Sequence, residues 1–299
     1  MFVLTAAFIA FAVGFAARGQ RVTTPEKVAV PVGGGASSAD SPASDGSSND
    51  QAGRRASNIG LALSWLAFGL LLVGLVLRGL WAGRVPWGNM YEFSLASAAG
   101  ILGVYLVIST RRDVRWLGLF VAGATLLTLG LAVTVLYTEA AQLVPALKSW
   151  WLVIHVSAAV ICGGAFTVAA GITVLYLWRE RAERLGHVTG VVAKLPDAAR
   201  LDTLAYRILA FAFPLWTFAV IAGAIWAENA WGRYWGWDPK ETWAFITWVF
   251  YAGYLHARAT AGWRGRRAAY ISLLGFASFL INYFGVNLFV NSLHSYAGL

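Results

Sequence analysis

The sequence predicts an all-α integral membrane protein with about eight transmembrane helices. Of its 299 residues, 59% are apolar and only 12% are charged, whereas a soluble domain has about 45–50% apolar and about 25% charged residues. The apolar residues fall in runs of roughly 20, which is the length that a helix needs to cross a hydrocarbon core of about 30 Å. This composition excludes an ordinary soluble globule and, for most of the chain, a disordered protein.

Eight apolar runs are the candidate spans. They lie at about 2–17, 59–77, 90–109, 116–136, 150–178, 204–226, 242–260 and 268–290. The first run is short enough to be a signal peptide, but no positive charge precedes it, and Arg18 and Arg21 follow it. We therefore interpret residues 1–17 as the first transmembrane helix. The fifth run is long enough to tilt or to extend beyond the bilayer.

The basic residues predict which side each loop faces. Only five of the 23 Lys and Arg residues lie in the segments after the even-numbered runs, namely Arg78, Arg84, Lys148, Arg233 and Lys240. The other 18 belong to the segments after the odd-numbered runs, which the positive-inside rule assigns to the cytoplasm. Both termini are then expected on the non-cytoplasmic side. This distribution accounts for the net charge of +9 without a nucleic-acid partner.

The segment between the first two runs differs in character from the rest of the chain. Residues 32–50 are rich in Gly, Ser and Asp and cannot bury a core. We expect a flexible cytoplasmic linker over 18–58 and a seven-helix membrane domain over 59–299. The later basic loop, at 179–203, has mixed charge and is expected to hold a surface helix with a break near Pro196.

The tryptophans gather near the predicted outer face. Nine of the 15 lie there, namely Trp81, Trp87, Trp150, Trp151, Trp226, Trp231, Trp235, Trp237 and Trp243. Only four lie near the inner face. An aromatic belt would populate both interfaces, so a belt does not explain five tryptophans within residues 226–243. This segment is the strongest candidate for a binding surface.

The outer tryptophan segment has two interpretations. On a helix, Trp231, Trp235 and Asp238 would share one face, with Trp237 beside it. Such a platform suits a flat apolar ligand. The alternative is an amphipathic helix that lies on the membrane surface.

Charged residues in the same segment restrict the class of ligand that the segment could bind. Arg233 and Lys240 suit a planar molecule that carries carboxylates, and haem has this chemistry. The Asp238-Pro239 pair predicts the start of the next helix, with Asp at the N-cap and Pro in the first turn.

The four histidines are expected at different depths. His155 and His294 lie near the outer face, on either side of the tryptophan segment in the chain. His256 is about 21 Å along its helix from the outer face, counting 1.5 Å per residue, and an ionisable residue at that depth indicates a functional site. The alternative for His256 is a hydrogen bond between helices. His187 lies in a charged loop and is interpreted as a solvated surface residue.

Cys162 is the single cysteine of the chain. The chain therefore forms no internal disulfide, no Cys-x-x-Cys redox pair and no cysteine-based zinc or iron–sulfur site. Cys162 follows His155 by seven residues and is expected on the same face of the helix. A small packing residue is a far better interpretation than a ligand.

The first outer loop is a second candidate motif. It carries four residues at the mouth of the third helix, namely Pro86, Asn89, Tyr91 and Glu92. Glu92 is favourable at a helix start because of the helix dipole. It could instead join a polar network with Arg84 or Arg233, and the sequence does not choose between these alternatives.

Several of these residues resemble a known family. The run 231–243, which contains Trp231-Gly232-Arg233-Tyr234-Trp235-Gly236-Trp237-Asp238-Pro239, resembles the WWD signature of haem-handling proteins in cytochrome c maturation. Within that group the chain is similar to the CcsA/ResC family, a subunit of the two-component cytochrome c synthase. Further matches lie at 86–92, 145–156, 201–207, 254–258 and 291–296, so that the resemblance covers residues 86–296.

The resemblance implies roles for particular residues. His155 and His294 would be the outer pair of axial ligands of the haem iron, and His256 would be the ligand within the membrane. The haem-binding platform would consist of Trp231, Arg233, Trp235, Trp237 and Asp238. The residues Pro86, Asn89, Tyr91 and Glu92 would form a secondary motif beside it. No residue is assigned to catalysis with certainty.

The resemblance also implies a function. The chain would carry haem b to the outer face and present it for thioether attachment to the Cys-x-x-Cys-His motif of apocytochrome c. Its expected partners are a ResB/CcsB-type membrane subunit, apocytochrome c and a thioredoxin-like thiol reductant. Its expected location is the plasma membrane of a bacterium, or the thylakoid membrane if it is plastid-encoded. The alternatives are a haem-handling protein of the CcmC or CcmF type without ligation activity, a pure transporter and a scaffold.

Overall fold

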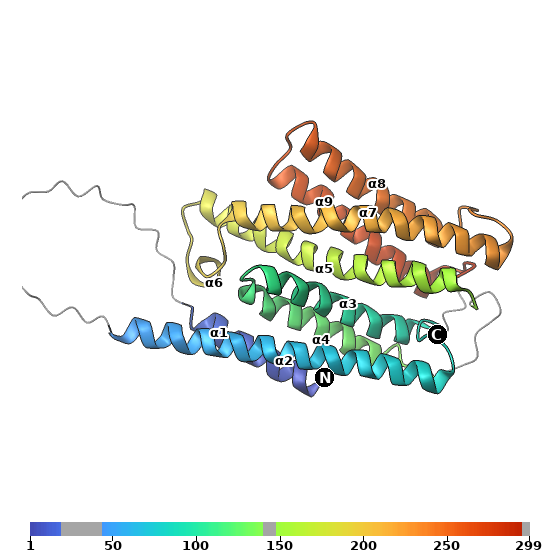
Figure 1. The fold of residues 1–299 in the computed structure, drawn as a ribbon. Helices are drawn as coiled ribbons and strands as arrows, with labels where there is room; N and C mark the ends of the chain where they lie inside the picture. The colour runs from blue at the N-terminus through green and yellow to red at the C-terminus, as the bar shows by residue number, and fades with distance from the viewer. Residues whose placement is uncertain (19–43, 140–147, 295–299) are drawn as a thin grey trace, which may run out of the picture.

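The protein is seen in a computed structural model that describes residues 1–18, 44–139 and 148–294. These residues form a bundle of long helices that run side by side (Figure 1). The elements are α1 (Phe2–Ala16), α2 (Ser44–Ala82), α3 (Met90–Arg111), η1 (Arg115–Leu117), α4 (Gly118–Thr134), α5 (Trp150–Arg184), α6 (Gly190–Ala193), α7 (Ala198–Trp231), α8 (Pro239–Ala259), α9 (Arg266–Leu280), η3 (Ile281–Gly285) and α10 (Val286–Phe289). The described parts of the chain contain no strand, which agrees with the predicted all-α class.

Each predicted run coincides with a helical segment, but the segments differ in length and hydropathy, the two properties that a membrane span requires. Six helical segments are long and apolar enough to do so, namely Asn49–Ala82, Met90–Arg111, Arg115–Thr134, Trp150–Arg184, Ala198–Trp231 and Arg266–Phe289. Helix α1 has only 15 residues, and α8 contains Lys240, Glu241 and Arg258. The prediction of a multi-pass helical membrane protein is therefore confirmed. The number of eight spans and the side of each terminus stay predictions.

The structure differs from the expected linker at one end. Residues 44–58 are helical and belong to α2, while residues 19–43 lie outside the described parts. The extra turns of α2 pack closely on α1, because a side chain on Gly14 would lie 2.3 Å from the Ser57 hydroxyl and 2.9 Å from the Gly53 carbonyl. Packing against α1 thus extends the helix into a segment that composition alone assigns to a linker.

Helix α5 is the centre of the bundle. It packs against α3, α7 and α9, and the apolar part of it is largely buried. The α3–α5 contact depends on two glycines, since a Cβ on Gly164 would lie 2.5 Å from the Gly100 carbonyl. Such close approach of small residues is typical of helix packing in membranes. Cys162 is fully buried in this core, with Sγ 3.6 Å from the Ala212 carbonyl, which supports its interpretation as a packing residue.

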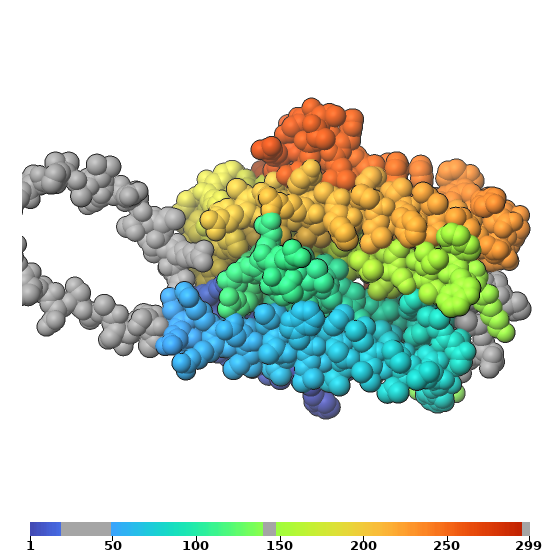
Figure 2. Space-filling view, in the orientation of Figure 1, coloured from blue at the N-terminus to red at the C-terminus, as the bar shows by residue number. Residues whose placement is uncertain are grey.

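The lateral surface of the bundle, along the sides of the helices, is apolar over long stretches. Figure 2 shows α2 along one side of the bundle and the end of α8 as a projection on the opposite side. Helix α2 exposes Leu70, Val73, Leu77 and Leu80, which suits contact with lipid. The alternation of antiparallel helices brings the ends of α2 and α7 and the starts of α3, α5 and α8 to one end of the bundle (Figure 1). This end is the predicted outer end, and it carries the site.

Candidate functional site

A cavity of about 180 Å³ lies at the predicted outer end of the bundle. Its wall is formed by residues of α3, α5, α7, α8, α9, η3 and α10, together with the loops before α3 and after α7 and the segment that contains His294. Nine aromatic residues line it, namely Trp87, Phe93, Trp216, Trp226, Trp231, Tyr234, Trp235, Phe279 and Tyr283. His155 and His294 face the same cavity, although they are 139 positions apart in the chain. An aromatic cavity with two imidazoles can bind a flat apolar molecule that contains a metal ion.

His155 is held by α7. Its Nδ1 lies 2.7 Å from the Ala219 carbonyl oxygen, and its ring is parallel to that of Trp226 at 6.4 Å between centroids. A carbonyl oxygen can only accept, so Nδ1 carries the proton and donates it. The neutral imidazole then keeps the lone pair of Nε2 for a metal ion. This arrangement is the usual one for a histidine ligand whose other nitrogen is fixed by a hydrogen bond.

His294 is held in the same way by a carboxylate. Its Nδ1 lies 2.9 Å from Asp238 Oδ2. Asp238 also accepts from the Leu293 amide at 2.8 Å and the Lys240 amide at 3.2 Å. Burial lowers the pKa of His294 below 6.5 and outweighs the nearby carboxylate. Burial would raise the pKa of Asp238, but the hydrogen bonds from His294 and the two amides lower it overall. The pair is therefore a neutral imidazole that donates to an ionised carboxylate.

The loop between α7 and α8 is not the helix that the tryptophan spacing suggests. Helix α7 ends at Trp231, because Gly232 adopts φ 70°, a conformation that glycine accepts readily. Helix α8 begins with a capping box, in which Asp238 and Glu241 satisfy each other's backbone amides. The predicted continuous helix over Trp231–Asp238 is therefore wrong, and the predicted start at Asp238-Pro239 is confirmed.

The platform residues separate into two groups. Trp231 and Trp235 line the cavity, and Trp231 meets the His294 ring edge-to-face at 4.8 Å. Trp237 does not line it; this residue has a positive φ of 57°, is 64% exposed and packs edge-on against Trp235. The Arg233 guanidinium lies over Gly236 and is 3.9 Å from Glu241. Among the described residues, Lys240 is the lysine or arginine that lines the cavity.

His256 lies apart from this cavity. It is exposed on the surface of α8 and does not belong to the wall around His155 and His294. The sequence motifs at 201–207 and 254–258 contact each other instead. Arg258 of the second motif donates two hydrogen bonds, of 2.7 and 2.9 Å, to Asp202 of the first motif on α7. His187 is exposed in its loop, as predicted.

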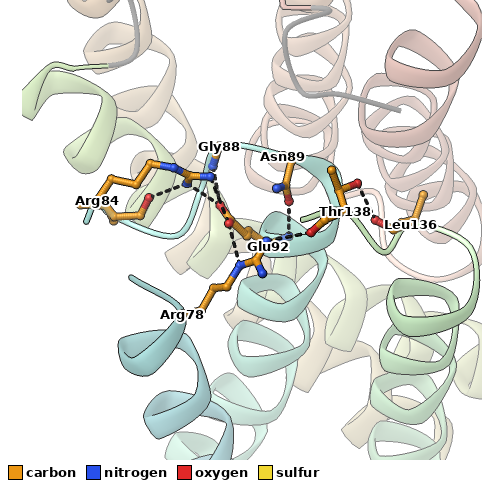
Figure 3. A network of polar contacts seen from close by, with 8 residues as sticks. Arg78, Arg84, Gly88, Asn89, Glu92, Leu136 and Thr138 are labelled. Carbon is orange, nitrogen blue, oxygen red and sulfur yellow. Dashed lines mark hydrogen bonds and ion pairs between the residues drawn. The ribbon is translucent and has the colours of Figure 1, made fainter. Parts of the chain in front are cut away.

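A buried carboxylate holds the first outer loop beside the cavity (Figure 3). Glu92 is fully buried. Its Oε1 accepts from Arg78 Nε at 3.0 Å, and its Oε2 accepts from Arg84 Nη1 at 2.6 Å and from the Gly88 amide at 2.9 Å. Arg78 also donates to the Thr138 carbonyl at 2.7 Å, which ties the segment after α4 to the same cluster. Of the two arginines weighed from the sequence, Arg84 is the partner and Arg233 is not.

This cluster shapes one wall of the cavity. Asn89 caps α3 by accepting from the Glu92 amide at 2.8 Å, and Trp87, Gly88 and Asn89 line the cavity. Tyr91 does not line it and packs edge-on against Tyr137 at 5.2 Å between centroids. Pro86 packs against the end of α2, since a Cβ on Gly79 would be 3.2 Å from its ring.

Three residues of this end of the bundle are not singled out by the sequence pattern. Arg78 closes α2 and looks like an ordinary interface arginine. Asn282 and Tyr283 line the cavity from the π-helical turn η3, a feature that is frequent at functional sites. A polar Asn within an apolar run is the one signal that could have indicated this turn.

The approach of His155 to α7 depends on Gly223. A Cβ at that position would lie 2.7 Å from His155 Nδ1. Gly223→Ala is therefore expected to displace the imidazole and to break its bond to Ala219. Chemical shifts of the His155 ring, measured on histidine-labelled protein, should change, whereas Gly171→Ala, at a helical position with open space around it, should leave them unchanged. Identical spectra for Gly223→Ala and the wild type would contradict this assignment.

The fold and the cavity together define a multi-pass helical membrane protein with a pair of histidines in a tryptophan-lined site at one end. A sequence model of the family described as "Cytochrome C assembly protein" matches residues 87–294, the part of the chain that contains this site. The chain belongs to this family.

Relatives named "Cytochrome c biogenesis protein CcsA" support the same assignment. The protein of Guillardia theta is 36% identical over 259 residues, which cover 81% of this chain and 86% of the relative. That of Prochlorococcus marinus is 36% identical over 253 residues, or 76% and 80% of the two chains. That of Marchantia polymorpha is 34% identical over 266 residues, or 75% and 82%.

Proposed function

We propose that this chain acts in cytochrome c maturation as the haem-handling subunit of a membrane cytochrome c synthase. In this role it brings haem b to the outer face of the membrane and presents it to apocytochrome c. The observation that carries the proposal is the pair of histidines in one aromatic cavity. Each has Nδ1 engaged by an acceptor, Ala219 or Asp238, so that Nε2 is the nitrogen that would bind iron.

The other groups of the cavity fit haem as the substrate. Its aromatic wall can stack on a porphyrin face, and Lys240 supplies a cation for a propionate. A free volume of about 180 Å³ is below the roughly 300–1,000 Å³ of a pocket that encloses a ligand of this kind. The cavity is therefore too small to enclose haem, and we propose that haem binds there with one edge outside the cavity.

An open edge suits the ligation reaction. In that reaction each thiol of the apocytochrome adds across a vinyl group of haem, which forms a carbon–sulfur bond without net oxidation. The chain supplies no thiol of its own there, because Cys162 is buried in the core beside Ala212. The thiols come from the Cys-x-x-Cys-His segment, kept reduced by a thioredoxin-like partner. The role of the chain is to bind, to orient and to exclude water.

His256 belongs to a second part of the proposal. Because it is exposed on α8, its imidazole is accessible to another membrane subunit. We propose that haem first meets His256 in the membrane, with a second ligand from a ResB/CcsB-type partner. The location that suits this pathway is a bacterial plasma membrane or a thylakoid membrane.

Reconstitution separates synthesis from transport. The chain and its partner subunit are placed in liposomes with haem inside and a reduced Cys-x-x-Cys-His apocytochrome outside. Covalent haem on the apocytochrome, detected by mass and by a haem stain after denaturation, is the expected result. Haem that reaches the outside without covalent attachment would favour a handling protein of the CcmC or CcmF type. No movement of haem in either form would contradict both functions.

Asp238 is expected to support haem binding through His294. Asp238→Asn keeps an acceptor for the backbone amides but removes the negative charge of the carboxylate that faces the His294 imidazole. Loss of such a partner weakens metal binding about 10- to 100-fold. Haem titration of the purified chain, followed by Soret absorbance, should show this loss. The reduction potential of bound haem should also rise, because a less basic imidazole stabilises the ferric state less.

Asp197→Asn is the matched control for this substitution. Asp197 is also an N-cap, since it accepts from the Arg200 amide at 2.8 Å at the start of α7, but it lies at the other end of the bundle. Its replacement should leave haem affinity and potential unchanged. Equal effects of the two substitutions would mean that Asp238 acts only as a helix cap.

A further inference from the structure

A second cavity lies at the opposite, predicted cytoplasmic end of the bundle. Its volume is about 570 Å³, and it is bounded by the end of α1, the turn between α3 and η1, and the segment from α6 into α7. We call this cavity the inner groove. The proposed synthase activity uses none of its residues.

The inner groove is strongly basic. Its lining contains five basic residues, namely Arg18, Arg112, Lys194, Arg200 and Arg207, and one acidic residue, Asp113. Asp113 is paired with Arg115 at 2.9 Å, and Arg200 is paired with Asp197 at 3.0 Å. Among the described residues of the lining, basic side chains therefore outnumber acidic ones, which favours an anionic ligand.

Two arginines of the inner groove are available to such a ligand. Arg112 is the C-cap of α3, and Arg207 lies on α7. Both are exposed, and neither forms an ion pair or a side-chain hydrogen bond with any part of the chain that the structure describes. They come from helices that are far apart in the sequence, yet they border one cavity. A phosphate group between two guanidinium groups is the kind of contact that arginine makes best.

The floor of the inner groove is apolar. Val114, Leu195, Pro196 and Leu201 contribute to it, and Trp116 lies beside them, as is common at a membrane interface. An inorganic anion has no use for such a floor, whereas an acyl chain does. The groove also lies at the ends of helices, where the apolar spans stop and where lipid headgroups are expected.

We propose that the inner groove binds an anionic phospholipid, with its phosphodiester between Arg112 and Arg207 and the start of its acyl chains on the apolar floor. The bound lipid fastens α1, the α3–η1 turn and α7 to one another at the cytoplasmic leaflet. Basic pockets between helices on this side of a membrane are suited to such headgroups.

Native mass spectrometry of the full chain tests the proposal. Protein purified in an uncharged detergent is mixed with phosphatidylglycerol and phosphatidylcholine of the same acyl chains. The wild type should retain phosphatidylglycerol in preference. The double variant Arg112→Gln/Arg207→Gln should lose about 30-fold of this preference, since each basic residue near an anionic headgroup contributes about fivefold.

A matched variant and a free anion complete the test. Arg111→Gln/Arg181→Gln removes the same charge from exposed positions at the same end of the bundle, outside the groove, and should keep the preference. Unfolding temperatures in phosphatidylcholine, equal for all variants, show that the fold is intact. Equal preferences in both double variants would overturn the proposal. Displacement of the lipid by millimolar inorganic phosphate would overturn it too, because the groove would then be a site for a free anion.

Discussion

Replacement of either outer histidine by alanine is expected to lower the haem retained by the purified chain at least about tenfold. Loss of a group that merely orients a ligand costs about 10- to 100-fold in metal affinity, and loss of the ligand itself costs no less. His155→Ala and His294→Ala should each shift the Soret band as the axial ligation changes. Added imidazole should restore part of the haem in both variants, because it can occupy the coordination position left by the side chain.

Two other histidines provide controls. His187→Ala, in an exposed loop, should leave haem content unchanged. His256→Ala should lower haem content but leave the spectrum of the outer site as it is, because His256 does not line the cavity. Unchanged spectra in both His155→Ala and His294→Ala would exclude these residues as ligands. Normal haem content in His256→Ala would remove the intramembrane site from the proposal.

Neutralisation of Glu92 is expected to have the largest effect on stability. Glu92→Gln leaves Arg78 and Arg84, with side chains 8% and 10% exposed, without the carboxylate that balances them. Removal of one partner of a buried ion pair lowers the free energy of unfolding by about 3–5 kcal/mol, because the remaining charge is buried without a partner. Thermal unfolding of the purified chain should show a markedly lower Tm. Hydrogen exchange should increase at Gly88, whose amide donates to Glu92 at 2.9 Å.

Glu180→Gln is the control for charge removal alone. Glu180 lies 3.6 Å from Arg184 on the same helix, and the Arg184 side chain is 51% exposed. Such exposed pairs contribute about 0–1 kcal/mol, so its Tm should stay close to that of the wild type. A Glu92→Gln variant with the Tm and the Gly88 exchange of Glu180→Gln would show that the cluster does not hold the loop.

Local signals explain what could be predicted along the chain. A helix start depends on a few neighbouring residues, and Asp238-Pro239 carries this information within one turn. The expected helix over Trp231–Asp238 was wrong for an equally local reason, since Gly232 ends α7. The spacing of tryptophans was a weaker signal than one glycine, because helix periodicity is meaningful only where the backbone stays helical.

Two features could not be predicted from neighbouring residues in the sequence, namely the helix over residues 44–58 and the arginine partner of Glu92. Residues 44–58 have the composition of a linker, yet they are helical in a segment that packs on α1. Arg84 and Arg233 were both possible partners of Glu92, and only the fold excludes Arg233 by placing it beside Glu241. The fold also decides which basic residue of the tryptophan segment faces the cavity, because Lys240 lines the cavity and Arg233 does not.

The sequence by itself determined the helical membrane class and the order of the helices, because the length of each apolar run is a local property of the chain. It also placed most tryptophans in the segments that meet at one end of the bundle, and the outer side of that end stays a prediction. It also indicated His155 and His294 as a pair. Only the tertiary structure decided how they are held, through Ala219, 64 positions from His155, and Asp238, 56 positions from His294. Hydrogen bonds over such separations depend on how helices pack, and no local pattern of residues encodes that packing.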